Sequence, residues 1–223
     1  RARAAPLPGG MWLLADVWPD AGPNARVLDG SGKVTREFRV GDCFNDIQVT
    51  REGSLWVSYC DEGVYGDGLG QAGLLRFDLT GNITFSFADL PDLPFIDDCY
   101  ALNVVSDRET WVCYYSDFPV VQIVDGKPGR VWKDMAPGGP STFAVGKQSA
   151  LFGPGYQSDD QLTLIDLDRR KRSKHPVATP EGKVKTLKQG RYSARGSRFF
   201  FCDDVLNRLL VVDLSALTFR WRS

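Results

Sequence analysis

Carboxylate and carboxamide side chains concentrate in a few short stretches of this sequence. Asp61 and Glu62 open the glycine-rich stretch CDEGVYGDGLGQAG (60–73), and the pairs Asn45-Asp46 and Asp97-Asp98 each precede a run of strand-forming residues. The oxygen atoms of such side chains are the ligands that Ca²⁺ and Mg²⁺ prefer. The candidate ligands of a divalent cation are Asn45, Asp46, Glu62, Asp98 and Asn103.

Aromatic residues accompany these acids, which indicates a second kind of chemistry. Rings offer contact area and carboxylates offer charge, and together they suit a basic or hydroxyl-rich ligand. The candidate ligand-binding residues are Asp61, Glu62, Tyr65, Asp97, Tyr100, Asp117 and Phe118. A plainer alternative stays open, because Asp and Asn also bond neighbouring backbone amides in turns at strand starts.

Several carboxylates brought to one place would repel one another. Two like charges ~4 Å apart repel by about 1 kcal/mol in water and by about 4 kcal/mol in a partly shielded site. A bound cation, protonation, or side chains that point into water relieve this cost. Whether the acids converge depends on the elements that carry them.

A repeat links these stretches. Five strand-like runs end in an apolar residue followed by Asp, and these aspartates are Asp29, Asp78, Asp125, Asp166 and Asp213. After each one comes a short turn and, in most cases, another clear extended run, as in GSGK followed by VTREFRV and LTGN followed by ITFSF. Turn residues between two extended runs are typical of a β-hairpin.

Two further extended runs precede each hairpin, so one unit holds four short strands in about 45 residues, with no helical periodicity. This pattern predicts an all-β fold, a β-propeller of four-stranded antiparallel blades. The predicted blades of this single domain cover residues 1–41, 42–90, 94–135, 137–180 and 184–222. The five blades either close a ring or belong to a six-bladed ring whose remaining blade lies outside this sequence. The last run, LTFRWRS, fills an outermost position, so no strand exchange between the chain ends is expected.

In a propeller, the loops that lead into the innermost strands share one face with the loops that join the second and third strands. We call this the top face. The segments 41–46 and 94–98 are of the first kind, and 60–73 and 115–119 are of the second. Blades 2 and 3 therefore bring most of the acids and their aromatic neighbours to the top face. The basic run RRKRSK (169–174) is expected at a hairpin tip on the opposite face.

The composition argues against several other classes of protein. The 223 residues carry 27 basic and 28 acidic side chains, and this balance provides no field that would attract nucleic acid or an anionic membrane. No apolar run approaches the ~18 residues of a membrane span. The single histidine, His175, has no partner pattern for catalysis. Five cysteines without a CxxC pair indicate free thiols in a reducing compartment, with one disulfide such as Cys43–Cys99 left open. We expect a cytoplasmic monomer.

Three stretches carry a resemblance to known proteins. WVSYCDEGVYG (56–66), GLLRFDLTGNI (73–83) and IDDCYALNV (96–104) resemble segments of an uncharacterised bacterial propeller family, and the whole repeat resembles the NHL, YVTN and SMP-30/gluconolactonase-like group. The resemblance implies the propeller fold. SMP-30-like enzymes hold a divalent cation at the channel through Glu, Asn and Asp side chains and hydrolyse lactones. No candidate here falls in a motif that matches those enzymes position by position, so no catalytic residue is assigned.

The leading functional prediction is a non-catalytic propeller that binds a small molecule or a protein partner through its acidic, aromatic-lined top face. The alternative is an SMP-30-like metal-dependent hydrolase or lactonase with Ca²⁺ or Mg²⁺ at the channel mouth. A third interpretation is a structural domain of a larger polypeptide. No nucleic-acid or membrane partner is expected.

Overall fold

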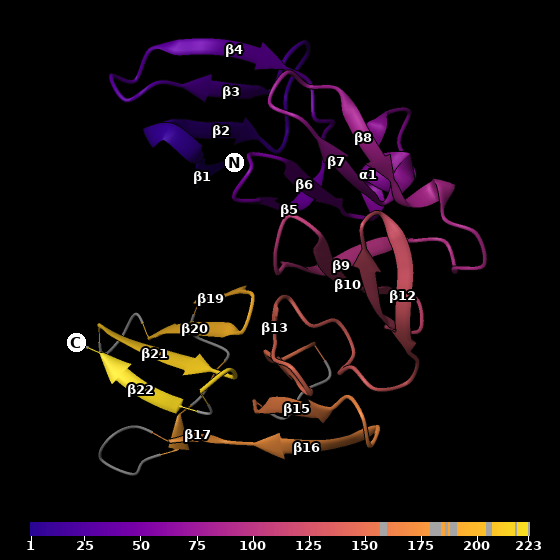
Figure 1. Cartoon of the computed structure of the whole chain (residues 1–223), viewed down its shortest axis with the longest axis vertical. Coiled ribbons are helices and arrows are strands. Elements are labelled where there is room, and N and C mark those ends of the chain that lie inside the picture. The colour runs from indigo at the N-terminus through magenta and orange to yellow at the C-terminus, as the bar shows by residue number, and fades with distance from the viewer. Residues whose placement is uncertain are drawn as a thin grey trace.

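Five four-stranded antiparallel sheets stand around a central axis in the computed structural model, forming a five-bladed β-propeller (Figure 1). The all-β propeller predicted from the repeat is confirmed. The structure describes residues 1–156, 160–178, 184–185, 187, 191–203, 207–216 and 218–222. Each blade consists of four consecutive strands in chain order, and the first strand of each is innermost, so that β5 contacts β1 and β9 while β13 contacts β9 and β19.

The strands of blades 1 to 3 are β1 (Ala2–Pro6), β2 (Trp12–Asp16), β3 (Ala25–Leu28), β4 (Val34–Phe38), β5 (Phe44–Val49), β6 (Leu55–Tyr59), β7 (Leu74–Phe77), β8 (Ile83–Ser86), β9 (Asp98–Val104), β10 (Glu109–Tyr115), β11 (Val120–Val124) and β12 (Lys127–Trp132). Those of blades 4 and 5 are β13 (Phe143–Val145), β14 (Ser149–Phe152), β15 (Leu162–Asp166), β16 (Lys171–His175), β19 (Arg191–Arg195), β20 (Arg198–Asp203), β21 (Arg208–Asp213) and β22 (Thr218–Arg222). A small hairpin of β17 (Val177–Ala178) and β18 (Val184–Lys185) lies between them in sequence. The short helices are α1 (Asp61–Val64) and the 3-10 turns η1 (Pro8–Gly10), η2 (Leu69–Ala72) and η3 (Phe87–Asp89).

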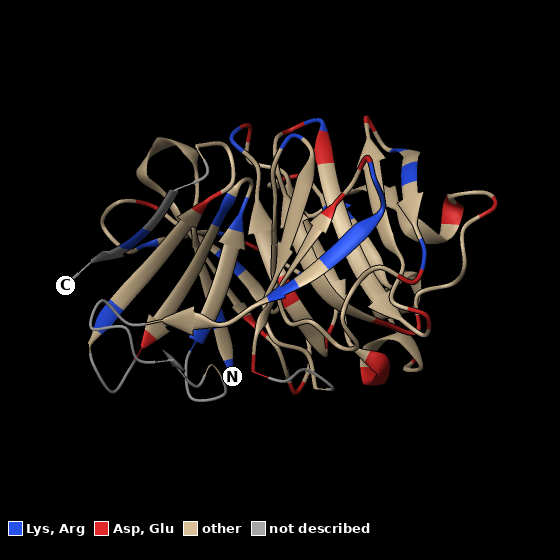
Figure 2. Ribbon diagram, turned by 90° about the horizontal axis from the view of Figure 1, so that it is seen from below, with Lys and Arg blue, Asp and Glu red and all other residues tan. Residues whose placement is uncertain are grey.

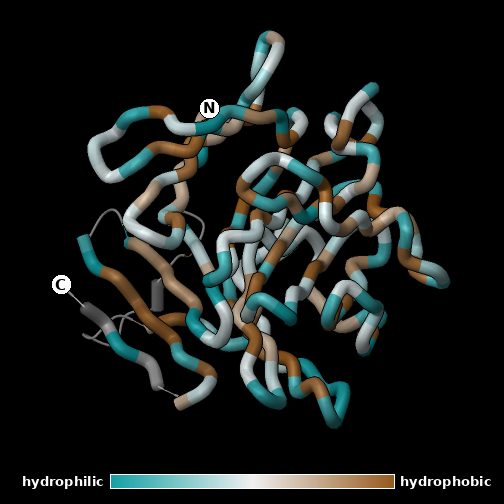
Figure 3. Tube along the Cα trace, turned by 45° about the horizontal axis from the view of Figure 1, so that its top comes forward, coloured by the Kyte–Doolittle hydropathy of each residue, from teal (hydrophilic) through white to brown (hydrophobic). Residues whose placement is uncertain are grey.

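Burial follows the position of a strand within its blade. Every residue of β6 is buried, whereas β16 at an outer edge is exposed along its whole length. The apolar clusters of the described residues lie between successive blades, and stacked Trp111 and Trp132 belong to the cluster between blades 3 and 4. Figure 3 shows hydrophobic stretches running through the strands and hydrophilic ones at the reversals. Blade-to-blade packing therefore provides the core.

The repeated aspartates close the hairpins between third and fourth strands. The Asp78 carboxylate accepts hydrogen bonds from the backbone amides of Thr80 and Asn82 at 2.8 and 3.0 Å. Three other aspartates bind backbone amides that follow them in the same manner, namely Asp29, Asp166 and Asp213. Hydrogen bonds from the Ser31, Thr80 and Ser215 side chains, and then from backbone amides, favour the charged form of Asp29, Asp78 and Asp213 and lower the pKa of each; for Asp166 the backbone amide of Arg169 has the largest lowering effect. Asp125 instead pairs with Arg108 at 2.5 Å.

Amide side chains brace the innermost strands near the axis. Asn103 on β9 is fully buried, and its Nδ2 donates to the carbonyl oxygens of Phe143 and Gly196, both at 2.9 Å. Its Oδ1 accepts the Gly196 N–H at 2.8 Å. Gln48 on β5 likewise donates to and accepts from the backbone of β9, at 2.8 and 2.9 Å. Because a satisfied buried amide holds its partners in one arrangement, these residues fix the relative positions of blades 2 to 5.

The segment 60–73 contains α1 and η2, although the sequence shows no helical periodicity there. Helices of four residues are too short to produce a visible period. The two helices touch at a pair of glycines, and a Cβ atom at Gly70 would lie 2.4 Å from the carbonyl oxygen of Gly63. Glycine is needed here because two backbones approach closely.

The first and last blades have no strand in common, since β1–β4 and β19–β22 each complete a sheet. A cavity of about 400 Å³ lies between them and is lined by residues of β1, β5 and β19. Arg195 reaches across to blade 2, where it donates to the Gln48 side chain at 3.1 Å and to the Val49 carbonyl oxygen. Both chain ends lie on this side of the ring (Figure 1).

All five cysteines are free thiols, and Cys43, Cys99 and Cys113 are buried. Within the described part of the chain, no helix is long and apolar enough to cross a membrane. The basic run 169–174 occupies the turn before β16 and continues into that exposed strand.

Candidate functional site

Three aspartates and three tyrosines line a pocket of about 310 Å³ on the top face. Its lining residues are Asp61, Tyr65, Asp97, Asp98, Tyr100 and Tyr115. Asp61 begins α1, Asp98 begins β9 and Tyr115 ends β10, so these side chains come from one end of blades 2 and 3. Figure 2 shows the acidic helix α1 at one edge of the propeller. We call this cavity the acidic pocket.

The carboxylates of this region influence one another's ionisation. Burial, followed by the charges of Asp61 and Glu62, raises the pKa of Asp98 to about 6, against the lowering effect of a 2.8 Å hydrogen bond from Asn45. A hydrogen bond between the side chains of Asp61 and Glu62 raises the pKa of Asp61. The Cys60 thiol, which donates to Glu62 Oε2 at 3.1 Å, lowers the pKa of Glu62. The acidic pocket thus carries more negative charge than its surroundings compensate, and a cation would relieve it.

One tyrosine is anchored at its hydroxyl and open at its ring. The Tyr65 hydroxyl donates to Asp97 Oδ1, and this bond raises the pKa of Tyr65. The residue is nevertheless 70% exposed. A ring fixed at one end and free on its face is suited to contact a ligand at low entropic cost.

A cluster of aromatic rings lies beside the acidic pocket, and two of its members, Tyr100 and Tyr115, line it. Tyr100 packs edge-on against Phe118 with centroids 5.4 Å apart, and Tyr115 and Tyr156 also contact Phe118 at 5.7 and 5.9 Å. Tyr115 and Tyr156 remain 45% and 58% exposed. A Cβ atom at Gly139 would lie 2.0 Å from the Tyr156 ring, so glycine leaves the space that the ring occupies. The rings of this cluster therefore pack against one another and still expose part of their surface to solvent.

The five predicted cation ligands do not meet at one point. Asn45 and Asp98 are hydrogen-bonded, and Glu62 lies nearby but is exposed on α1. Asn103 lies towards the other end of β9, roughly 16 Å from Asp98 at the usual rise of a strand. A different donor group does converge, because Cys60 Sγ and carboxylate oxygens of Asp61 and Glu62 lie within 4.8 Å of one another.

Asp46, the remaining predicted ligand, lies in the channel. Its carboxylate accepts hydrogen bonds from the Gln48 side chain and the Ile47 N–H, both at 2.9 Å. Burial raises its pKa, whereas Gln48 and then the charge of Arg3 lower it. Asp46 is thus engaged in a polar network inside the ring and is set back from the acidic pocket.

Of the seven predicted ligand-binding residues, four line the acidic pocket, namely Asp61, Tyr65, Asp97 and Tyr100. Glu62 is adjacent to it on α1. Asp117 and Phe118 instead line a neighbouring cavity of about 440 Å³, together with Arg172 and Lys174 of β16. Tyr115 was not selected as a site residue, although its position in the loop YSDFP on the same face was a usable signal.

The fold and this pocket define a β-propeller with an acidic, aromatic-lined cavity on one face. Residues 74–205 match the YxzG family, which is more than half of the chain, and the protein therefore belongs to the YxzG family. Among curated proteins none matches the sequence. The placement in the NHL, YVTN and SMP-30-like group stays a prediction.

Several solved propeller structures are similar in fold. Streptogramin B lyase shares 14% identity with a TM-score of 0.55, over 100% of this chain and 82% of that one. Apo AztD from Citrobacter koseri shares 14% identity with a TM-score of 0.51, over 98% and 57%. Dihydro-heme d1 dehydrogenase NirN in complex with DHE shares 16% identity with a TM-score of 0.56, over 98% and 45%. This chain thus spans about half the length of AztD and NirN, and the likeness is one of fold.

Proposed function

We propose that this protein is a non-catalytic binding propeller whose acidic pocket takes a positively charged organic group, carried by a small molecule or by a basic side chain of a protein partner. The observation that carries the proposal is the lining itself, which holds three carboxyl groups and three tyrosine rings and, among the residues that the structure describes, no basic side chain. Carboxylates attract a cation, and tyrosine faces add cation–π attraction of about 0.5–2 kcal/mol.

The size and exposure of the acidic pocket support this choice. A volume of about 310 Å³ is at the small end for ligand pockets and suits one ammonium or guanidinium group with its nearest carbons. The NirN propeller structure, in complex with DHE, is an example of a similar fold in a protein that binds a small molecule.

The acidic pocket is tested by calorimetric titration with choline chloride and with arginine amide, and with 3,3-dimethyl-1-butanol, the uncharged analogue of choline, as the control. We expect the two cations to bind and the uncharged analogue to give no heat. Asp98→Asn should weaken binding on the order of tenfold, because it removes a charge in a partly shielded site. Asp89→Asn, an exposed acid outside the lining, is the matched control and should leave affinity unchanged.

The pH dependence gives a second readout of the same site. Because the pKa of Asp98 is raised to about 6, its carboxyl is largely neutral below about pH 5 and charged above about pH 7. Affinity for choline should therefore rise through this interval, and the Asp98→Asn variant should lose most of the rise. Failure of both cations to bind at neutral pH would refute the proposal.

A metal-dependent hydrolase is the second candidate. One observation favours it, which is the convergence of Cys60, Asp61 and Glu62 donor atoms within 4.8 Å. The Asn45, Asp46 and Asn103 side chains are occupied by protein partners, and we derive no hydrolytic step through them. Thermal melting with and without Ca²⁺, Mg²⁺, Mn²⁺ and Zn²⁺ tests this candidate, and the absence of any shift would remove it.

A further inference from the structure

A second cavity, of about 1090 Å³, opens at the face opposite the acidic pocket. It is formed by the turns between first and second strands and by neighbouring parts of blades 3, 4 and 5. Five basic side chains line it, namely Arg51, Arg130, Lys147, Arg195 and Arg198. Its acidic lining consists of Glu109 and Asp213. We call it the basic cavity.

The two acids of the basic cavity are already committed to protein partners. Glu109 accepts hydrogen bonds from the indole of Trp111 at 2.8 Å and from Gln122 at 2.7 Å. Asp213 is bound by Arg198 at 3.1 Å and by the Ser215 amide at 3.0 Å. Among the basic lining residues, only Arg198 is therefore neutralised by an acid of the cavity.

Arg195 is the most informative of these cations because it is partly buried. Its guanidinium donates to two uncharged acceptors, the side-chain oxygen of Gln48 and the carbonyl oxygen of Val49. It forms a direct ion pair with none of the described carboxylates. Burial lowers its pKa, against the raising effect of the more distant charges of Asp46 and Asp107. A partly buried guanidinium without a carboxylate in direct contact carries a desolvation cost that an anion in the cavity would offset.

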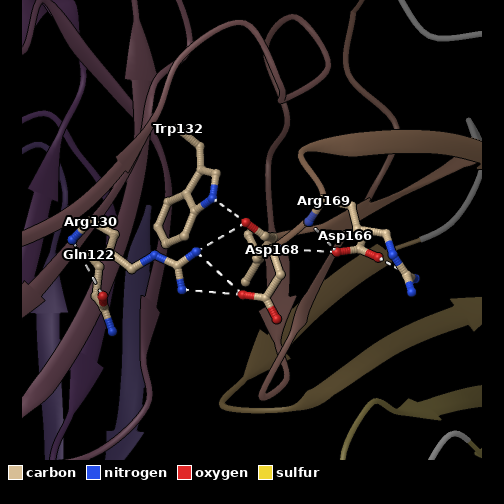
Figure 4. A network of polar contacts seen from close by, with 7 residues as sticks. Gln122, Arg130, Trp132, Asp166, Asp168 and Arg169 are labelled. Carbon is tan, nitrogen blue, oxygen red and sulfur yellow. Dashed lines mark hydrogen bonds and ion pairs between the residues drawn. The ribbon is translucent and has the colours of Figure 1, made fainter.

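Arg130 is held ready for a ligand in a different way. Its guanidinium lies 4.6 Å above the Trp132 ring and donates to the Leu167 carbonyl oxygen at 3.1 Å. Figure 4 shows this arrangement, in which Arg130 also forms an ion pair with Asp168 at 3.5 Å. Stacking fixes the plane of the guanidinium and leaves donors that an oxyanion can use.

Arg51 and Lys147 stand on separate turns, between β5 and β6 and between β13 and β14. Both are exposed, and neither makes an ion pair with a carboxylate in the described ranges. The basic cavity thus combines one stacked, one partly buried and two unpaired cations that come from four different blades.

From this geometry we infer that the basic cavity binds a small organic polyanion, a molecule with two or more carboxylate or phosphate groups. Its volume suits a small molecule, since ligand pockets are typically a few hundred to about 1,000 Å³. Nucleic acid is a poorer match, because an extended basic stripe would be expected for a polymer and the chain as a whole has a net charge of −1.

The inference is tested by calorimetric titration of the full chain with citrate and with pyrophosphate, which separate a carboxylate source from a phosphate source. We expect at least one probe to bind at millimolar or lower concentration, more weakly at higher salt. The double variant Arg51→Gln/Lys147→Gln should weaken binding on the order of tenfold, since it removes two charges that make no direct ion pair with a described carboxylate. The exposed Arg36→Gln on β4 lies outside the basic cavity and should bind as the parent does.

The Arg195→Gln variant should not bind either probe. This substitution also removes two hydrogen bonds to blade 2, so the melting temperature of the variant must be compared with that of the parent protein. The decisive measurement is the affinity of the double variant, because neither Arg51 nor Lys147 forms a direct ion pair with a described carboxylate. Absence of heat from both probes, or equal weakening by Arg36→Gln, would overturn the inference. The Asp98→Asn variant should retain anion binding, which keeps this result independent of the acidic pocket.

Discussion

Replacement of Asp98 by asparagine removes one negative charge from the acidic pocket while it keeps the shape of the side chain. The side-chain oxygen that accepts the Asn45 hydrogen bond at 2.8 Å is retained. What changes is the cost of holding a charged carboxylate there, because burial, followed by the charges of Asp61 and Glu62, raises the pKa of Asp98 to about 6. The variant should therefore be more stable than the parent at neutral pH.

The expected gain follows from that pKa. A rise from 3.8 to about 6 corresponds to about 3 kcal/mol of unfavourable free energy for the charged form. Solvent screening of a partly exposed group reduces this to about 1.5 kcal/mol. For a chain of this length, such a gain raises the melting temperature by about 3–6 °C.

The sign of the effect depends on pH. Well below pH 3.8, Asp98 is protonated in both the folded and the unfolded state, so the variant gains nothing. Between about pH 4 and pH 6 the parent loses stability, because only its unfolded state releases the proton readily, and the advantage of the variant grows. Above about pH 7 the advantage is constant.

Thermal melting of parent and variant across this pH range measures the difference directly, with Asp89→Asn as the exposed control. A gain that is equally large at acidic and neutral pH would show that its origin is not electrostatic. A loss of stability of the variant at neutral pH would refute the claim that the charged Asp98 carboxylate is unfavourable in the acidic pocket.

Two further predictions concern the stability of the propeller fold. Asn103→Ala leaves the partly buried Gly196 N–H without its acceptor and the buried Phe143 carbonyl oxygen without its donor, and it should cost roughly 2–4 kcal/mol in chemical denaturation. Gln71→Ala, which removes an exposed loop bond, should be nearly neutral. Asp78→Ala removes a carboxylate whose pKa is lowered by the Thr80 and Asn82 bonds, so it should lower the melting temperature at neutral pH. That difference should narrow as the pH falls below 3.8, because the parent then loses the same stabilisation; a constant gap would contradict it.

The fold was predictable because it repeats. Aspartates such as Asp78 recur at one place in each unit, and the structure shows why, since each closes a hairpin that the propeller needs five times. Asp125 departs from this chemistry by pairing with Arg108, which the spacing alone did not indicate. The residues that form a turn are adjacent in the sequence, so the hairpin turns can be predicted directly from it.

The site was predictable only in part because it depends on contacts between distant residues. Asp61 and Asp97 were placed on one face by topology, and both line the acidic pocket. Asn103 was selected for its residue type, yet it braces blades 3 to 5 through bonds to residues 40 and 93 positions away. The basic cavity was not anticipated, because its cations come from separate blades and form no run in the sequence.

The first and last blades of this propeller meet without strand exchange, unlike those of a ring that is closed by a strand shared between the two chain ends. Parting blade 1 from blade 5 breaks no strand pairing, since each sheet is complete on its own. The apolar clusters at the two ends of the chain join blade 1 to blade 2 and blade 4 to blade 5. Arg195 bridges blade 5 to blade 2 and also lines the basic cavity, so an anion bound there would lie beside this junction.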